Sequence, residues 1–167
     1  HYDSVLLVGE FQKESIRFLE RKRNLKPKKL ISIGVPYIDS LIKEVKKERR
    51  SNKTILIGSS WGEKGCLRNY GSDFIKQLAE KKYNIIVRPH PHSMIYEKDF
   101  IIGIKGEFEK YENIIWDETI NPSRSMNNAD LLISDTSSIR FDFLFVHEKP
   151  VITLDVKSNQ MQGFERA

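Results

Sequence analysis

Four clusters of polar residues each follow an apolar run that has the length of a strand. The clusters are Gly58-Ser59-Ser60-Trp61-Gly62, Arg88-Pro89-His90-Pro91-His92, Trp116-Asp117-Glu118 and Ser134-Asp135-Thr136-Ser137-Ser138. The carboxyl ends of parallel strands share one edge of a sheet, and ligands of open α/β sheets bind outside that edge. We therefore expect the four clusters to converge on a single binding site.

The last cluster has the residue types of an anion site. Ser137 and Ser138 lead directly into a helical pattern at residues 138–147. The free backbone N–H groups and the positive dipole end of a helix start attract phosphate, and the two hydroxyls add donors. Asp135 or Thr136 could instead cap the helix and occupy the same N–H groups. The sequence leaves these two alternatives open.

The second cluster offers a cation, Arg88, and two imidazoles. Pro89 and Pro91 restrict the backbone on both sides of His90, which suits a histidine held against a ligand. A proline-rich turn with a surface histidine has the same pattern. Because His90 and His92 have no third ligand at a suitable spacing, no metal site is expected.

Several catalytic classes lack their sequence motifs. The P-loop spacing counted from Gly58 requires glycine at position 63 and serine or threonine at position 65, where this chain has Glu63 and Gly65. No G-x-G-x-x-G or H-E-x-x-H segment occurs. Nicotinamide oxidoreductases and zincins are therefore not indicated, and Ser-His-Asp hydrolase chemistry is not expected.

Apolar runs alternate with helical patterns along almost the whole chain. Strands are expected at residues 4–8, 30–34, 54–58, 84–88, 113–116, 130–134 and 150–155, and helices at 11–23, 36–47, 72–82, 122–128 and 138–147. Strands that are apolar on both faces and separated by helices indicate a parallel sheet covered on both sides. The expected fold class is α/β, a Rossmann-like parallel sheet with helices on both faces. Phe141, Phe143, Leu144 and Phe145 are assigned to its core.

The charge of this 167-residue chain is distributed unevenly. Residues 1–53 carry 14 basic and 7 acidic side chains, whereas residues 54–167 carry a net charge of −2. The basic excess fits solvated helix faces or attraction to an anionic membrane surface or polyanion. No aromatic platform or motif for nucleic acid accompanies it, so nucleic acid is not an expected partner. The charged run at 46–53 is the best candidate for a domain boundary, and the single cysteine excludes a disulfide framework.

Three segments, in this order, resemble the CDP-glycerol glycerophosphotransferase family, the teichoic-acid primases and polymerases of bacterial cell-envelope synthesis. They are Thr-Ile-Leu-Ile-Gly-Ser-Ser-Trp at 54–61, Ile-Val-Arg-Pro-His-Pro at 86–91 and Ala-Asp-Leu-Leu-Ile-Ser-Asp-Thr-Ser-Ser-Ile-Arg-Phe-Asp-Phe at 129–143. Lys149-Pro150-Val151 follows them, and the earlier Gly34-Val35-Pro36-Tyr37-Ile38-Asp39 is similar to the segment that precedes the donor domain in that family. The resemblance extends over nearly the whole chain.

The resemblance implies a GT-B fold, in which two Rossmann-like domains enclose the active site. Residues 1–50 would then be the end of the N-terminal domain with the hinge, and residues 51–167 the nucleotide-donor-binding domain. It implies His90 as a catalytic residue, the donor phosphates at Arg88, Ser59, Ser60, Asp135, Thr136, Ser137 and Ser138, and the base near Trp116 and Asp117. It implies neither a metal nor another cofactor.

The same resemblance implies partners and a location. The donor would be CDP-glycerol or a related nucleotide, the acceptor a cell-envelope polymer such as teichoic acid, and the reaction the transfer of glycerol phosphate. The protein would be cytoplasmic and peripheral at the inner face of the bacterial membrane. The general base would belong to the other domain, so this chain alone is expected to be inactive.

Two other function classes share features of this sequence. A GT-B glycosyltransferase or a 2-epimerase-like enzyme that uses a UDP-sugar has the same layout. A non-catalytic binding module would use the basic N-terminal third, and its binding to anionic lipid or polymer would weaken with salt. Preference for a uridine donor would identify the UDP-sugar enzyme. Absence of nucleotide affinity would identify the non-catalytic binding module.

Overall fold

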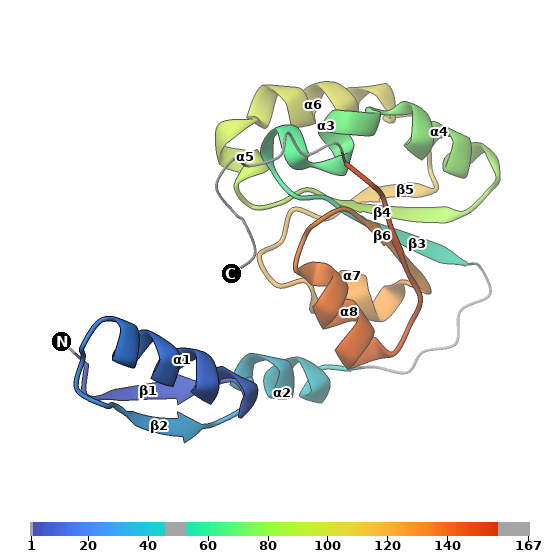
Figure 1. The fold of residues 1–167 in the computed structure, drawn as a ribbon. Coiled ribbons are helices and arrows are strands. Elements are labelled where there is room, and N and C mark those ends of the chain that lie inside the picture. Colours follow the sequence, from blue (N-terminus) through green and yellow to red (C-terminus); the bar gives the residue numbers. More distant parts are fainter. Residues whose placement is uncertain (1, 46–52, 157–167) are drawn as a thin grey trace. The chain divides into compact units, whose positions relative to one another are not determined.

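The computed structural model describes residues 2–45 and 53–156. The chain divides into two compact units, residues 1–43 and residues 44–167 (Figure 1). Most of the charged run that we expected to mark a domain boundary, residues 46–52, lies outside the described residues. Among the described residues, no helix combines the length and the apolar composition needed to cross a membrane.

The first unit is a β-α-β segment followed by a second helix. Strand β1 (Ser4–Leu7) pairs in parallel with β2 (Lys29–Ser32), and helix α1 (Phe11–Lys22) connects them. Helix α2 (Pro36–Lys43) begins with a proline. Proline suits this position because the N–H group that it lacks would have no partner in the first turn of a helix. Two strands cover little surface, so Leu7 is buried while Phe11 remains 76% exposed.

The second unit has a parallel five-stranded sheet in the order β5-β4-β3-β6-β7. The strands are β3 (Thr54–Gly58), β4 (Asn84–Arg88), β5 (Ile114–Trp116), β6 (Leu131–Ser134) and β7 (Val151–Thr153). The chain proceeds outward from β3 to β5 and restarts on the other side of β3 with β6. The expected Rossmann-like fold class is therefore confirmed, and its switch point lies between β3 and β6.

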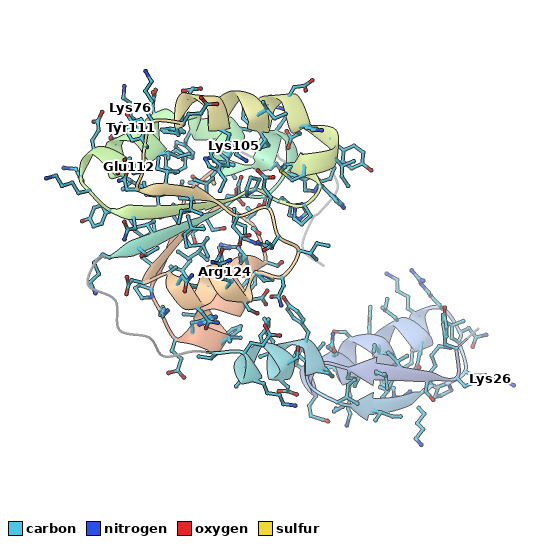
Figure 2. The ribbon with its side chains drawn as sticks, turned by 180° about the vertical axis from the view of Figure 1, so that it is seen from behind. Lys26, Lys76, Lys105, Tyr111, Glu112 and Arg124 are labelled. Atoms are coloured by element: carbon cyan, nitrogen blue, oxygen red, sulfur yellow. The ribbon has the colours of Figure 1, made fainter. Side chains whose placement is uncertain are left out.

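Helices cover both faces of this sheet (Figure 1). One face carries α3 (Cys66–Tyr70), α4 (Asp73–Glu80), α5 (Ser93–Tyr96) and α6 (Lys98–Glu107), and the other carries α7 (Ser123–Asn128) and α8 (Ile139–His147). Charged side chains such as Lys76 of α4 and Arg124 of α7 are exposed (Figure 2). The sequence patterns indicated α4, α7 and α8 but did not indicate α3, α5 or α6.

Alternating residues of β3 supply two cores. Ile55 and Ile57 belong to the cluster under α3, α4 and α6, and Leu56, which points to the opposite face, is also fully buried. Under α8 the assignment of the whole aromatic run to the core was wrong. Only Phe143 of that run is buried, while Phe141, Leu144 and Phe145 are 52%, 47% and 63% exposed. A helix on a sheet buries one stripe, and the other positions of this run lie outside it.

The carboxylate of Asp135 joins the two strand ends at the switch point. Asp135 directly follows β6 and is fully buried. Its Oδ2 accepts the N–H groups of Cys66 (2.6 Å) and Ser60 (2.9 Å), and its Oδ1 accepts the Ser60 hydroxyl (2.5 Å) and the N–H of Ser137 (3.0 Å). Because the donors come from the segment after β3 and from the residues before α8, this one carboxylate holds both segments in place.

A buried ion pair fixes the connection between β5 and α7. Arg88 Nη1 lies 2.7 Å from Asp117 Oδ2, and the two side chains are 7% and 11% exposed. Arg88 also donates to the Ile120 carbonyl (2.8 Å), and the Asp117 carboxylate accepts hydrogen bonds from Thr119 and Ser125. Burial alone raises the pKa of Asp117, but these hydrogen bonds and the Arg88 charge together hold it below its ordinary value.

Asp135→Asn is expected to lower the free energy of unfolding by about 3 kcal/mol, since the amide turns a donor toward buried N–H groups. The matched control is Asp130→Asn at the other end of β6, where Oδ2 accepts the Thr54 N–H (2.9 Å) and the side chain is 42% exposed. Its cost should stay below about 1 kcal/mol. Urea unfolding followed by circular dichroism compares the two variants, and equal costs would contradict the role assigned to Asp135.

Asp117→Asn leaves the Arg88 guanidinium buried without its counter-charge, and we expect a loss of about 3 kcal/mol in unfolding free energy at pH 7. The depressed pKa of Asp117 means that its contribution is present above the unfolded value of about 3.9 and is lost as the pH falls through the lower folded value. The difference in unfolding free energy between wild type and variant should therefore shrink as the pH falls from about 5 to about 2.5.

Glu118→Gln is the control for this measurement. Glu118 pairs with Lys105 at 2.6 Å, but both side chains are well exposed, so its removal should cost less than about 1 kcal/mol. If the unfolding free energies of wild type and Asp117→Asn differ by the same amount at pH 7 and pH 3, the stabilisation by the ion pair does not depend on ionisation of Asp117.

Candidate functional site

A cavity of about 460 Å³ opens at the carboxyl edge of the sheet in the second unit. The segments that follow β3, β4 and β6 all contribute to it, as expected for three of the four polar clusters. The residues that line it are Ser60, Trp61, Lys64, His90, Thr136, Ser137 and Ser138. Five of these seven were expected from the sequence as site residues, and Trp61 and Lys64 were not.

His90 lies in the wall of the cavity and is partly exposed. Its Nδ1 accepts the backbone N–H of His92 at 3.1 Å, a bond that Pro91 helps to form by restricting the backbone between them. Burial lowers the pKa of His90, the neighbouring His92 lowers it further, and the charge of Asp135 partly opposes both. His90 is therefore neutral at pH 7 with its proton on Nε2, the form that donates one hydrogen bond.

At the start of α8, one backbone N–H is capped within the protein and others remain available to an anion. Asp135 takes the N–H of Ser137, so this donor is used within the protein. The N–H groups of Ser138 and Ile139 have no acceptor among the described residues. Gly58 allows this helix start to approach β3, since a Cβ there would lie 3.0 Å from Ile139 Cγ2. The helix start thus retains backbone donors beside the Ser137 and Ser138 hydroxyls.

Ser59 and Asp135 lie beneath the cavity rather than in its wall. Ser59 is 3% exposed, donates to the Ser60 carbonyl (2.8 Å) and accepts the N–H of Leu67 (3.3 Å). Cys66 is buried beside them, and burial raises the pKa of its thiol to about 12, which removes it as a nucleophile at neutral pH. These residues shape the site and present no free group to a ligand.

Arg88, Trp116 and Asp117 are not among the residues that line the cavity. The Arg88 guanidinium and the Asp117 carboxylate bind each other, and Trp116 packs against the core cluster under α6. The exposed part of this connection is residues 118–121, in which Ile120 is 90% exposed. Arg88 and Asp117, two of the three residues expected to contact a ligand, therefore hold a loop at the same edge of the sheet.

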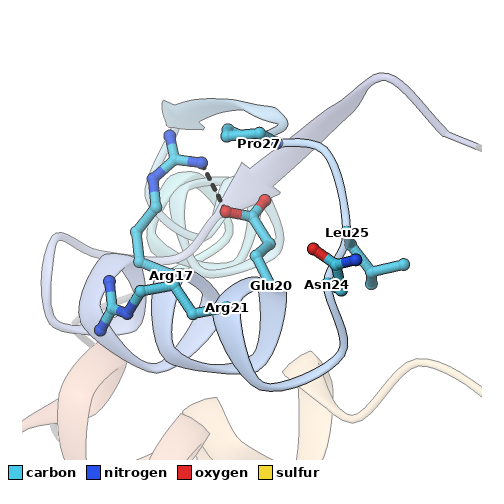
Figure 3. Close-up of a pocket in the computed structure, with 6 residues that line it drawn as sticks. All are labelled: Arg17, Glu20, Arg21, Asn24, Leu25 and Pro27. Carbon is cyan, nitrogen blue, oxygen red and sulfur yellow. Dashed lines mark hydrogen bonds and ion pairs between the residues drawn. The ribbon is translucent and has the colours of Figure 1, made fainter.

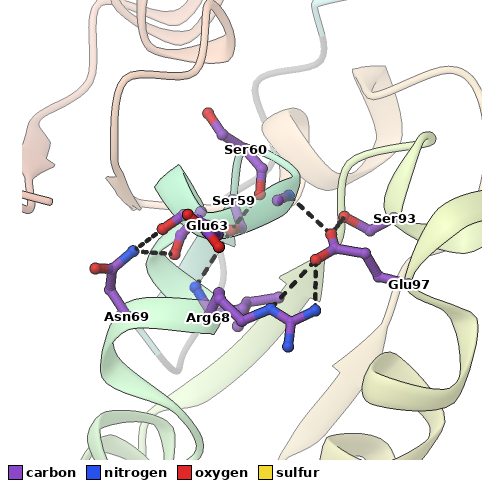
Figure 4. A network of polar contacts seen from close by, with 10 residues as sticks. Ser59, Ser60, Glu63, Arg68, Asn69, Ser93 and Glu97 are labelled. Atoms are coloured by element: carbon purple, nitrogen blue, oxygen red, sulfur yellow. Dashed lines mark hydrogen bonds and ion pairs between the residues drawn. The ribbon is translucent and has the colours of Figure 1, made fainter. Parts of the chain in front are cut away.

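Two carboxylates anchor the segment that carries Trp61 and Lys64. Asp135 holds its ends through the N–H groups of Ser60 and Cys66, and Glu97 accepts the N–H of Gly62 at 2.9 Å. Glu97 in turn receives hydrogen bonds from Arg68 (2.8 Å) and Ser93 (3.0 Å), as Figure 4 shows. Burial raises the pKa of Glu97, but these hydrogen bonds and the Arg68 charge hold it below its ordinary value.

Lys64 could have been found from its spacing. It occupies the lysine position of the P-loop pattern counted from Gly58, although the pattern fails at positions 63 and 65. Position 65 requires glycine for a reason unrelated to phosphate binding, because a Cβ there would collide with the Ser60 carbonyl oxygen. The Cys66 N–H that begins α3 binds Asp135 rather than pointing into a phosphate loop. The segment is therefore not a P-loop, although it places a lysine in the cavity.

Although hydrolase chemistry was not expected from the sequence, the segment after β3 does have the spacing G-x-S-x-G, with Ser60 in the position of a hydrolase nucleophile. The Ser60 hydroxyl donates to Asp135, and within the described residues it makes no hydrogen bond to a histidine. A nucleophile elbow also requires a strained backbone, and Ser60 is not among the described residues with positive φ. The geometry does not support hydrolase chemistry.

A second cavity, of about 420 Å³, lies in the first unit (Figure 3). It is lined by Arg17, Glu20, Arg21, Asn24, Leu25 and Pro27. Arg17 Nη1 lies 2.7 Å from Glu20 Oε2, and Glu20 Oε1 accepts the Lys28 N–H at 2.8 Å. These contacts close the α1–β2 turn, so the Arg17 guanidinium and the Glu20 carboxylate already bind within the protein.

The main cavity can bind an anion through the chain's own groups. Its wall offers the ammonium group of Lys64, the hydroxyls of Ser137 and Ser138, the Nε2–H of His90 and the helix start of α8. Within the described residues, no three His, Cys, Asp or Glu side chains cluster in a way that could hold a metal ion. The donor set suits phosphate groups.

Solved structures with a similar fold are those of a wall teichoic acid polymerase, TagF. One matches with a TM-score of 0.51 and 19% identity over 90% of this chain and 38% of the polymerase chain. A histidine-to-asparagine variant of TagF soaked with CDPG for 30 minutes matches with a TM-score of 0.51 and 20% identity, over 90% of this chain and 37% of that chain. This chain thus spans under two fifths of the TagF chains, and the likeness shows a shared fold.

A comparison with curated proteins gave no match. The family model described as CDP-Glycerol:Poly(glycerophosphate) glycerophosphotransferase matches residues 2–160, which include the three segments that suggested the family from the sequence. Since that match extends over nearly the whole chain, this protein belongs to the CDP-glycerol:poly(glycerophosphate) glycerophosphotransferase family.

Proposed function

We propose that this chain binds CDP-glycerol, or a related CDP-alcohol, and serves in the transfer of glycerol phosphate to a cell-envelope polymer such as teichoic acid. The observation that carries the proposal is the cavity at the switch point, whose wall combines hydroxyls, a helix start, a neutral imidazole and an ammonium group. The family match supports the choice of CDP-glycerol as the donor.

In the proposed reaction an acceptor hydroxyl attacks the phosphorus that bears glycerol. The new O–P bond forms while the P–O bond to CMP breaks, CMP leaves with the electron pair, and the acceptor proton passes to a general base. The groups that line this cavity would stabilise the negative charge on the phosphoryl oxygens and on the leaving CMP. His90 would donate its Nε2–H to one of these oxygens, which is how a neutral histidine acts at pH 7.

We also propose a domain organisation and a location for the protein. Residues 1–50 are proposed to belong to an N-terminal domain that supplies the acceptor side and the base, and residues 51–167 to form the donor domain. The exposed residues 119–121, supported by Arg88 and Asp117, are proposed to meet the cytosine base. The cytoplasmic face of the bacterial membrane, with the protein bound peripherally, is the proposed location, and the basic first third would favour it.

The proposal predicts that the chain binds cytidine nucleotides more tightly than uridine ones. Calorimetric titration with CMP, CDP-glycerol and UDP-N-acetylglucosamine at one moderate salt concentration tests it. His90→Ala and the double variant Ser137→Ala, Ser138→Ala should each weaken CDP-glycerol binding about tenfold, a loss of about 1.4 kcal/mol. Ser40→Ala in the first unit, whose hydroxyl donates to the Tyr37 carbonyl, is the control.

Each other outcome has a clear meaning. Tighter binding of the uridine ligand would retain the fold and the phosphate site but replace the donor with a UDP-sugar. Absence of affinity for all three ligands, with salt-sensitive binding to anionic vesicles, would favour the non-catalytic module instead. Unchanged binding in both site variants would contradict the assignment of the cavity.

A further inference from the structure

We propose that Lys64 supplies the positive charge that binds the diphosphate of the donor and makes the site select a nucleoside diphosphate over a monophosphate. The inference rests on the proposed function, because it assigns a residue within the same cavity. Lys64 ends the short 3₁₀ turn Gly62–Lys64 after β3 and lines the cavity together with the two serines before α8.

The Lys64 ammonium group has no partner among the residues that the structure describes. Among the described residues it makes neither an ion pair nor a side-chain hydrogen bond, although it is only partly exposed. The two buried carboxylates beside the segment are committed elsewhere, because Asp135 binds backbone N–H groups and Glu97 binds Arg68 and Gly62. The exposed Glu63 carboxylate makes no ion pair with Lys64 among the described residues. A lysine that faces a cavity without a counter-charge is ready to accept an anion.

Lys64 is the only side chain with a full positive charge among the seven residues that line the cavity. Thr136, Ser137 and Ser138 contribute neutral hydroxyls, and the depressed pKa of His90 leaves it neutral at pH 7. A diphosphate carries more negative charge than a monophosphate, and the attraction of one cation grows with the charge that it faces. The preference for a diphosphate should therefore depend on Lys64 more than on any hydroxyl.

The backbone around Lys64 is held before any ligand arrives. Asp135 fixes Ser60 and Cys66 on either side, Glu97 fixes Gly62, and Gly65 allows the turn to close against the Ser60 carbonyl. Gly62 adopts a φ of 72°, a left-handed conformation that favours glycine. When a lysine on such a backbone binds an anion, only its side chain loses conformational freedom. The entropic cost therefore offsets less of the free energy of binding.

The test uses the full chain and the variants Lys64→Met and Lys64→Arg, with Lys98→Met at the exposed start of α6 as the control. Calorimetric titration with CDP-glycerol, CDP, CMP and inorganic pyrophosphate is repeated at several salt concentrations. Lys64→Met should weaken binding of CDP, CDP-glycerol and pyrophosphate by at least about tenfold and CMP by less, with a shallower salt dependence. Lys64→Arg, which retains the charge, should stay within about threefold of wild type.

Failure of this inference is distinguishable from failure of the proposed function. Wild-type affinity for CDP-glycerol that is unchanged in Lys64→Met would overturn the inference and leave the donor assignment intact. Pyrophosphate binding that depends on Lys64, together with a preference for UDP-N-acetylglucosamine, would support Lys64 and overturn CDP-glycerol as the donor. A wild-type chain that binds none of these anions would contradict both.

Glu97→Gln provides a second measurement that does not alter the lysine. Loss of this anchor should weaken diphosphate binding several-fold, roughly as expected for one lost charge-assisted backbone contact, while Glu107→Gln at the end of α6 should not. In a Trp116→Phe background, Trp61 is the remaining tryptophan of the chain and reports on the segment directly. Its fluorescence should become more accessible to acrylamide in Glu97→Gln, and an unchanged signal would show that Glu97 does not hold the segment.

Discussion

The Asp135 carboxylate must accept hydrogen bonds from backbone N–H groups that belong to two separate segments, and the site depends on that requirement. Ser60 and Cys66 reach it from the connection after β3, and Ser137 reaches it from the connection before α8. A fully buried carboxylate is costly unless its oxygens are hydrogen-bonded, so the two segments must remain together for the charge to be tolerated. The cavity lies where these segments meet.

The same interaction limits the chemistry of the site. Every N–H that Asp135 accepts is withdrawn from a possible phosphate, so the segment after β3 cannot act as a loop of free backbone donors. Binding must then rely on side chains, namely Lys64 and the hydroxyls of Ser137 and Ser138, and on the remaining donors at the start of α8. Glu97 complements this arrangement because it accepts the N–H of Gly62 and so holds the segment that carries Trp61 and Lys64.

Much of the fold followed from local patterns, while individual contacts did not. The strands at 54–58 and 84–88 were expected with the bounds that the structure has, because each contains a run of three β-branched or aliphatic residues directly before a polar or glycine-bearing cluster. Helix α6 was not expected, since Gly103 and Gly106 lower helix propensity and only packing of Ile101 and Ile104 on the sheet compensates for them. In α8, the sequence could not show which aromatic side chains face the sheet and which face solvent.

The sequence by itself determined the succession of the strands along the chain, the helices α1, α2, α4, α7 and α8 between them, the polar character of each strand end and the membership of the family. Local periodicity and short motifs encode these properties. Only the tertiary structure decided which of those polar groups are available to a ligand. Arg88 turns to Asp117, 29 positions later, and Asp135 binds N–H groups up to 75 positions earlier, so neither choice is visible in its neighbours along the chain. Among the described residues, Lys64 is left without an ionic or hydrogen-bond partner by the same selection, because Asp135 and Glu97 bind elsewhere.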